Sequence, residues 1–209
     1  MANWMRTALG GWVAAWSLGA MIAPAMAFEA ATQPLAYPPP PGMTLTNGNP
    51  SNGLMLHARY NVNPMFLRQL VPYQSSERPG TIIVDTPHKF LYLITDRGWA
   101  LRYGIGTAKT GFEWNGVHQI TRKAEWPTWT PPAEMIARRP DIPHFMAGGI
   151  NNPLGARALY IGNTLYRVHG TNEPWTIGGD VSSGCIRMTN DDVTDLYARV
   201  RIGSKVVVL

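Results

Sequence analysis

Short apolar runs separated by turn residues fill the chain from Thr81 onward. Runs of about four to eight residues bounded by Gly, Asn or Asp are typical of β-strands. In order, the runs are TIIVD, KFLYLIT, WALRYGIG, VHQITRKAEW, RALYIG, TLYRVHG and SKVVVL. The pattern therefore predicts a mostly β domain over residues 81–209.

Two pairs of runs are expected to form antiparallel hairpins. KFLYLIT and WALRYGIG are separated by the turn sequence DRG. FEW and VHQITRKAEW flank Asn115-Gly116, and Asn-Gly is the strongest short hairpin signal. Successive hairpins favour an antiparallel arrangement.

A long connection and a helix interrupt the strands. Residues 127–143, PTWTPPAEMIARRPDIP, are rich in proline and leave room for one helical turn at Glu134–Arg138. Connections of this length within a domain are commonly lids or binding loops. Farther on, TNDDVTDLYARV has apolar residues at helical spacing, with Thr189 or Asn190 as the cap and acids in the first turn, which predicts a helix.

The first residues have the pattern of an export signal. They carry one positive charge at Arg6, then an apolar stretch, then the A-x-A sequence Ala-Met-Ala that ends at Ala27. We interpret residues 1–27 as a signal peptide. This predicts an exported protein of the periplasm or cell envelope, with no integral membrane span after processing.

Residues 28–80 have the composition of a linker. They are rich in Pro, Gly, Asn and Ser, and they include YPPPPG and TNGNPSNG. Apolar positions between Arg59 and Tyr73 fit a short strand or a turn of helix. We therefore expect a linker that precedes the β domain at 81–209.

Composition narrows the classes of function. Hydrophobic residues make up 45% and charged residues 15%, a balance that indicates a globular protein. The charge of +5 is mild and the basic residues are scattered, which fits an anionic envelope polymer better than nucleic acid. Four of the five histidines show no metal-ligand spacing with one another or with the cysteine, so we expect no zinc site; they are His57, His88, His118 and His144.

The only cysteine, Cys185, lies in RVHGTNEPWTIGGDVSSGCIRMTN. An unpaired cysteine in an exported protein suggests a reactive thiol or an intermolecular link. A nucleophilic thiolate needs a nearby cation or imidazole to lower its pKa. His169 ends a predicted strand 16 residues earlier, and the intervening Pro- and Gly-containing loop can fold back toward Cys185. The imidazole can then take the thiol proton and return it to a leaving amine.

Two neighbours of Cys185 are candidates for substrate binding. Gly184 leaves room for a substrate carbonyl, and the amides of Gly184 and Cys185 can face an oxyanion. Arg187 lies on the same side as Cys185 if the segment is extended, where it can hold a carboxylate. Taken singly, Cys185 also fits a buried small apolar residue, His169 a core histidine and Arg187 a surface ion pair.

His-Gly-Thr, followed after a Gly-rich loop by Ser-x-Gly-Cys-apolar-Arg-apolar, closely resembles the signature of the L,D-transpeptidase catalytic domain, or YkuD domain. The resemblance covers about residues 81–209, including MAGGINNPLGARALY and the final helix and strand. It implies a β-sandwich or barrel-like domain with one helix in the C-terminal region and a long lid-like loop.

The family also implies roles for individual residues. Cys185 would attack the peptide stem of peptidoglycan, His169 would serve as base, and the Gly170 carbonyl would orient the imidazole. Arg187 matches the family's arginine after the cysteine. Ser183 stands where many members have a second histidine, and we group it with Gly184 and Arg187 as substrate-binding candidates.

The activity implied is acyl transfer through a thioester, in peptidoglycan biosynthesis, cell-wall organisation and cell shape. Terminal D-alanine would leave, and an amine of a second stem or an envelope protein would accept the acyl group. With water as acceptor the enzyme would be a carboxypeptidase or endopeptidase, and without chemistry the domain would be a wall-binding module. In a papain-like protease the cysteine precedes the histidine, which is the reverse of the order here.

Overall fold

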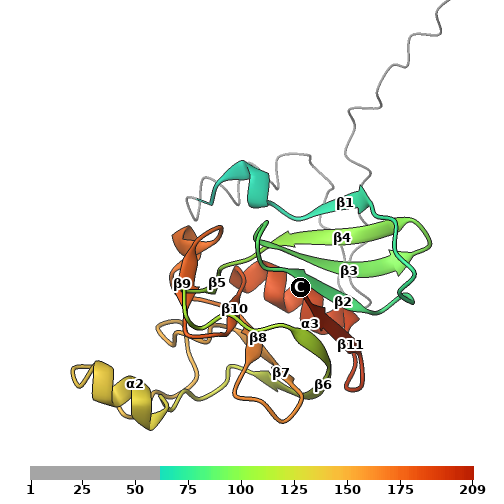
Figure 1. Ribbon diagram of the computed structural model, residues 1–209. Coiled ribbons are helices and arrows are strands. Elements are labelled where there is room, and N and C mark those ends of the chain that lie inside the picture. Colours follow the sequence, from blue (N-terminus) through green and yellow to red (C-terminus); the bar gives the residue numbers. More distant parts are fainter. Residues whose placement is uncertain (1–61) are drawn as a thin grey trace, which may run out of the picture. The chain divides into compact units, whose positions relative to one another are not determined.

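The computed structural model describes residues 62–209 (Figure 1). The predicted signal peptide and residues 28–61 of the predicted linker lie outside the described residues. The strands are β1 (Gln69–Pro72), β2 (Ile82–Asp85), β3 (Phe90–Asp96), β4 (Trp99–Gly104), β5 (Thr107–Ala108), β6 (Gly116–Glu125), β7 (Arg157–Ile161), β8 (Arg167–His169), β9 (Asp180–Ser182), β10 (Ile186–Arg187) and β11 (Lys205–Val208). The helices are η1 (Pro64–Phe66), α2 (Ala133–Arg138), η2 (Pro174–Thr176) and α3 (Asn190–Arg199). This confirms the mostly β prediction.

Nine strands follow one another in the order β1-β4-β3-β2-β11-β6-β7-β8-β10, and β5 pairs with β9 in a separate two-stranded sheet. The long strand β6 pairs with β11 through its first residues and with β7 through its last. Its register shifts between Ile120 and Arg122. Because such irregularities bend a strand, β6 can serve both halves of the sheet. Figure 1 shows α3 among these strands.

One large apolar cluster joins the sheet to α3. It contains buried residues of nearly all the strands together with Val193, Leu196 and Val200. A smaller cluster of Ile83, Ile94 and Ala100 covers the other face of β2 to β4. Fully burying a Val, Leu or Ile side chain contributes about 1.5–3 kcal/mol. The helix is therefore held by the same core as the strands that carry the candidate site.

The expected helices are both present. The predicted turn at Glu134–Arg138 belongs to α2. Thr189 caps α3, since its hydroxyl accepts a hydrogen bond from the Asp192 amide at 3.1 Å. Satisfying one of the free amides at a helix start stabilises the helix by about 1 kcal/mol.

Of the two expected hairpins, the first is confirmed and the second is wrong. β3 and β4 pair antiparallel across the DRG turn. β6, however, begins at Gly116, and its partners are β11 and β7 rather than residues 112–114. The Trp114 indole instead donates a 2.7 Å hydrogen bond to the Gly184 carbonyl and stacks on Tyr166. This tertiary contact overrides the local Asn-Gly signal.

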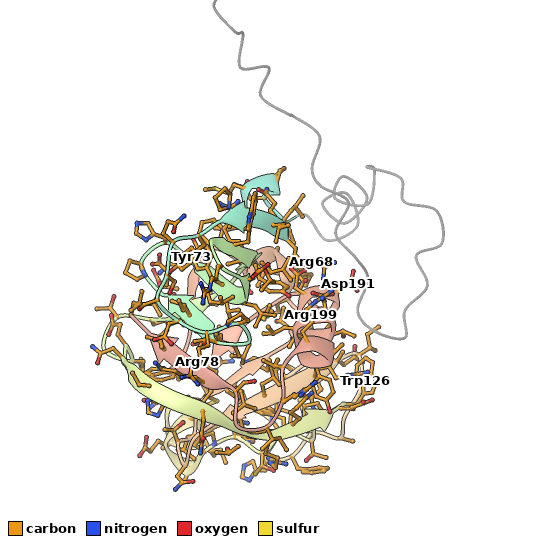
Figure 2. All side chains as sticks on the ribbon, turned by 90° about the vertical axis from the view of Figure 1, so that its right-hand side faces the viewer. Arg68, Tyr73, Arg78, Trp126, Asp191 and Arg199 are labelled. Atoms are coloured by element: carbon orange, nitrogen blue, oxygen red, sulfur yellow. The ribbon has the colours of Figure 1, made fainter. Side chains whose placement is uncertain are left out.

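Residues 62–80 belong to the folded unit. β1 pairs antiparallel with β4, which confirms a short strand in the region between Arg59 and Tyr73. Arg68 Nη1 lies 3.1 Å from Asp195 Oδ2 and 3.6 Å from Asp192 Oδ1, both on α3. Figure 2 shows Arg68 beside the helix that carries Arg199. The linker interpretation therefore does not describe residues 62–80.

The long connection between β6 and β7 is pinned at its base by Asn152, which is 1% exposed. Its side-chain amide donates to the carbonyls of Pro127, Met146 and Ala147, and its Oδ1 accepts from the Leu154 amide. Four bonds from one buried side chain fix both ends of the connection. The connection therefore leaves and rejoins the domain at one point.

Candidate active site

Cys185 and His169 are brought together by two neighbouring parallel strands. His169 ends β8 and is paired in register with Arg187 of β10, and the Met188 amide donates to the His169 carbonyl at 2.9 Å. Cys185 directly precedes β10. Since side chains alternate along strands, Arg167 and His169 share the face of the sheet toward which Cys185 and Arg187 also point. The site is thus a pair of strand ends that carries a thiol, an imidazole and two guanidinium groups.

The imidazole of His169 is held in one tautomer. Its Nδ1 lies 2.5 Å from the Gly170 carbonyl oxygen. A carbonyl can only accept, so Nδ1 carries the hydrogen and Nε2 is left as the basic nitrogen. Burial lowers the pKa of His169 to about 3, and the charges of Arg187 and Arg167 add to this effect, although the bond to Gly170 opposes it. The imidazole is therefore neutral at pH 7 and can accept a proton.

Gly170 has no room for a side chain. A Cβ at this position would lie 2.2 Å from the Asn190 side-chain oxygen. The Gly170 amide donates to the Arg157 carbonyl of β7 at 3.0 Å, and Asn190 Oδ1 accepts from the Ala156 amide at 2.9 Å. The carbonyl that orients His169 is therefore fixed by both β7 and the start of α3.

The turn before Cys185 is organised by Ser182. The Ser182 hydroxyl donates to the Cys185 carbonyl at 2.5 Å and accepts from the Gly184 amide at 3.2 Å. Gly184 has φ +110°, and a Cβ there would lie 2.2 Å from the Tyr166 ring. Only glycine suits both the backbone and the packing. The Gly184 amide, expected to face an oxyanion, is instead bonded to Ser182, while Ser183 is exposed.

The thiol of Cys185 is partly exposed, and its Sγ lies 3.9 Å from the Leu165 carbonyl oxygen. Burial raises the pKa of Cys185, whereas the charge and hydrogen bonds of Arg167 and the charge of Arg187 lower it. Because His169 is neutral, no imidazolium stabilises a thiolate in the resting state. The site therefore starts as thiol and imidazole, with two arginines as its nearby cations.

Arg187 is ion-paired. Its Nη1 lies 3.0 Å from Glu173 Oε2, and its side chain is 19% exposed against 46% for Glu173. Its backbone pairs with Gly106 in an isolated bridge. The arginine therefore lies at the site, with a half-exposed carboxylate as its present partner.

Four residues of the site were not singled out from the sequence: Arg167, Ser182, Trp114 and Tyr166. Arg167 could have been found, because it precedes His169 by two residues on a predicted strand and so shares its face. Ser182 is the first residue of the Ser-x-Gly-Cys sequence. The stacked rings of Trp114 and Tyr166, 4.4 Å apart, come from distant segments and carry no local signal.

A cavity of about 240 Å³ opens beside Gly184. Lys89 and Asp180 also line it, and Lys89 Nζ lies 2.6 Å from Asp180 Oδ1.

Within residues 62–209, no group of three His, Cys, Asp or Glu side chains is placed to hold a metal ion. In the same part of the chain, no helix has the length and apolar character needed to cross a membrane.

The arrangement is that of a cysteine and histidine site on a mostly β domain. The sequence profile of the L,D-transpeptidase catalytic domain family, YkuD, matches residues 79–208. The chain belongs to this family. The match of the family profile to residues 79–208 agrees with the resemblance seen in the His-Gly-Thr and Ser-x-Gly-Cys sequences.

Two relatives from Escherichia coli K12 bear names of the same family. "Probable L,D-transpeptidase ErfK/SrfK" is 37% identical over 138 residues, which is 63% of this chain and 44% of that protein. "Probable L,D-transpeptidase YcfS" is 28% identical over 242 residues, covering 98% of this chain and 75% of that protein. The chain thus spans less than half the length of ErfK/SrfK.

A solved structure supports the fold. The catalytic domain of the Enterococcus faecium L,D-transpeptidase, acylated by ertapenem, superposes with a TM-score of 0.50 at 20% identity. The match covers 65% of this chain and all of that domain. At this identity the similarity shows the fold alone.

Proposed function

We propose that the chain is an exported enzyme that transfers acyl groups from peptidoglycan stem peptides through a thioester on Cys185. The observation that carries the proposal is the 2.5 Å contact of His169 Nδ1 with the Gly170 carbonyl, on the strand beside the one that Cys185 precedes. This arrangement supplies a neutral base whose free nitrogen is Nε2. Family membership supplies the class of substrate.

The chemistry proceeds in two steps. His169 Nε2 takes the thiol proton as the Cys185 sulfur attacks the carbonyl carbon between the L-centre of a diamino acid and the terminal D-alanine. The C–N bond breaks, the proton passes to the leaving amine, and D-alanine departs. An acceptor amine then attacks the thioester, its proton passes to His169, and the thiol is restored.

Substrate binding falls to residues around the thiol. Arg187 is proposed to hold a substrate carboxylate, which would replace the half-exposed Glu173 as its partner. Gly184 and the exposed Ser183 border the approach to the sulfur. No metal or cofactor takes part in this scheme.

The acceptor and the compartment complete the proposal. The acceptor is an amine of a second stem or of an envelope protein, which gives the enzyme a role in peptidoglycan biosynthesis, cell-wall organisation and cell shape. Residues 1–27 direct export to the periplasm or envelope. Water as acceptor would give a carboxypeptidase from the same thioester.

A carbapenem tests the thioester. The Enterococcus faecium domain is acylated by ertapenem in its structure, and we expect ertapenem to add its mass to one site of the folded chain. Cys185→Ser should abolish the adduct, and His169→Gln should slow acylation by about 10²- to 10⁴-fold. An unmodified wild type after long exposure, or an adduct that persists in Cys185→Ala, would contradict the proposal.

A second measurement identifies the acceptor. The protein is incubated with a stem tetrapeptide in the presence and absence of an acceptor amine, and the products are analysed by mass spectrometry. Joined peptides with release of D-alanine support transfer. Release of D-alanine with only hydrolysed donor, at every amine concentration, would leave the carboxypeptidase.

A further inference from the structure

Arg167 is a charged residue of the site with no assigned role. It begins β8, two residues before His169, and its side chain is partly buried. In a strand this spacing places both side chains on one face. Arg167 therefore lies on the side of the sheet toward which Cys185 and His169 also point.

The contacts of Arg167 converge on the same carbonyl as the thiol. Its Nη2 donates to the Leu165 carbonyl at 3.0 Å, and Cys185 Sγ lies 3.9 Å from that oxygen. Its guanidinium also lies 5.5 Å from the ring centre of Tyr160. Its Nε is buried and has no hydrogen-bond partner within residues 62–209. Arg187 Nε is likewise buried and without a partner in this part of the chain, so the two arginines do not differ in this donor.

The two arginines of the site differ in how far their charge is neutralised. Arg187 is paired with Glu173 at 3.0 Å. In the part of the chain that the structure describes, Arg167 forms no ion pair with a carboxylate. Of the two arginines near the thiol, Arg167 is thus the one without a carboxylate partner in the described residues.

A thiolate at this position needs a counter-charge. The charged and titratable groups that face the thiol are Arg167 and His169 from β8, and Arg187 from β10 with its partner Glu173. Burial keeps His169 neutral, since it lowers the pKa of that group to about 3. Opposite charge within a few ångströms favours the ionised form of a thiol, and the effect is larger where water is partly excluded.

We propose that Arg167 is a positioning residue that stabilises the Cys185 thiolate through a positive charge that is not paired with a carboxylate within residues 62–209. Arg187, paired with Glu173, is left to meet the substrate. The inference rests on the proposed function only in taking Cys185 as the nucleophile. The residue that stabilises the thiolate would then lie outside the His-Gly-Thr and Ser-x-Gly-Cys sequences.

The rate of alkylation of Cys185 by iodoacetamide, measured against pH on the full chain, tests the inference. Removing a group that lowers the pKa of the thiol raises that pKa. Arg167→Gln should therefore move the alkylation midpoint upward by about one pH unit and slow alkylation at pH 7 by about tenfold. Arg167→Lys, which keeps the charge, should restore most of the rate.

Arg122→Gln is the matched control. Arg122 lies 3.5 Å from the ring centre of Tyr160, the same ring that Arg167 approaches, but it belongs to β6, two strands away from β8. Its alkylation profile should remain that of the wild type. If Arg167→Gln does not fold, Arg167→Met keeps the apolar stem against Tyr160 and carries the same expectation. A folded variant without the Arg167 charge that shows the wild-type profile, or an equal shift in Arg122→Gln, overturns the inference.

Alkylation needs no stem peptide, so the role of Arg167 and the proposed acyl transfer can be tested independently of each other. A shifted profile in Arg167→Gln together with a wild type that ertapenem leaves unmodified would overturn the acyl transfer and support the role of Arg167. An unshifted profile together with normal acylation would overturn the role of Arg167 alone.

Discussion

The Tyr103 hydroxyl of β4 donates a 2.7 Å hydrogen bond to Asp195 Oδ2 of α3, across 92 residues of sequence. The same carboxylate accepts two 2.9 Å bonds from Arg199 and lies 3.1 Å from Arg68 Nη1. These partners come from the segment before β1, from β4 and from α3 itself. They fix the helix whose first residue, Asn190, packs on Gly170. The buried network therefore supports the residue that orients His169.

Tyr103→Phe should destabilise the protein by about 1.5–3 kcal/mol, because it removes a buried hydrogen bond to a charged acceptor. Urea unfolding measures the change. Tyr92→Phe on the neighbouring strand β3 is the control and should cost less than about 0.5 kcal/mol, since its ring contacts with Tyr73 and Phe90 are retained. Equal losses in the two variants would show that the bond to Asp195 contributes nothing.

The segment before Thr81 should be required for full stability. A chain that begins at Asn61 keeps β1 and the Arg68 contacts with α3, whereas one that begins at Ser76 loses both. Loss of Arg68 also leaves the buried carboxylate of Asp192 without its ion-pair partner, while Asp195 keeps Arg199, and breaking a buried pair costs about 3–5 kcal/mol. We expect the shorter chain to unfold at a much lower urea concentration. Coincident unfolding curves would restore the linker interpretation for residues 62–80.

Sequence patterns predicted the strands and helices that local alternation and helical spacing determine, such as the β3–β4 hairpin and α3. The Asn115-Gly116 hairpin was wrong because Trp114 is drawn to Gly184, 70 residues away. A short strand was expected between Arg59 and Tyr73, but its pairing with β4, which begins 30 residues farther along the chain than β1, could not be predicted from the turn-rich composition. Errors arose where a long-range contact outweighed local propensity.

At the site, the sequence placed Cys185, His169, Gly170 and Arg187 in one region because strand order and the family motif carry that information. The bond from Ser182 to the Cys185 turn and the ion pair of Arg187 with Glu173 depend on loop geometry. These two contacts have no periodicity from which they could have been predicted. Arg167, in contrast, precedes His169 by two residues on a predicted strand, so its place on the same face could have been predicted.

Two buried groups should give the stability opposite dependences on pH. Burial lowers the pKa of His169 to about 3 from 6.5, so the unfolded chain binds the extra proton, and this contribution to stability is lost as pH falls from about 6.5 toward 3. Burial raises the pKa of Asp192 to about 6 from 3.8, so the folded chain binds the extra proton, and this contribution is lost as pH rises through about 6. In the wild type the two trends offset each other.

Single variants should separate these trends. The free energy of unfolding of His169→Gln should decrease between pH 4 and pH 7 relative to the wild type, while that of Asp192→Asn should increase, each by more than about 1 kcal/mol. His144→Gln, which removes an exposed imidazole, should parallel the wild type. Parallel curves for all four proteins would show that neither buried group is linked to folding.

Arg187→Ala should reduce turnover of a stem tetrapeptide far more than it slows alkylation of the thiol by iodoacetamide. The expectation follows from the role of Arg187 in holding a carboxylate; its charge is paired with Glu173, and Arg167 is the second cation near the thiol. Glu173→Gln frees the guanidinium and should leave peptide binding intact or improve it. Equal losses in both assays for Arg187→Ala would point to a structural role.

Ser182→Ala should slow acylation of Cys185 by about tenfold while the protein remains folded. The hydroxyl that donates to the Cys185 carbonyl and accepts from the Gly184 amide is buried, at 6% exposure of the residue. Removing the hydroxyl leaves the Gly184 amide without its acceptor, which costs about 1–3 kcal/mol, and loosens the turn that positions the Cys185 sulfur.

Ser204→Ala is the control, because the Ser204 hydroxyl accepts a hydrogen bond from the Arg201 amide at 3.2 Å in a turn before β11. Ertapenem acylation followed by mass spectrometry, alongside urea unfolding, should show a slower reaction in Ser182→Ala only. A wild-type acylation rate in folded Ser182→Ala would mean that the turn is held by Gly184 and its contacts with Trp114 and Tyr166 alone.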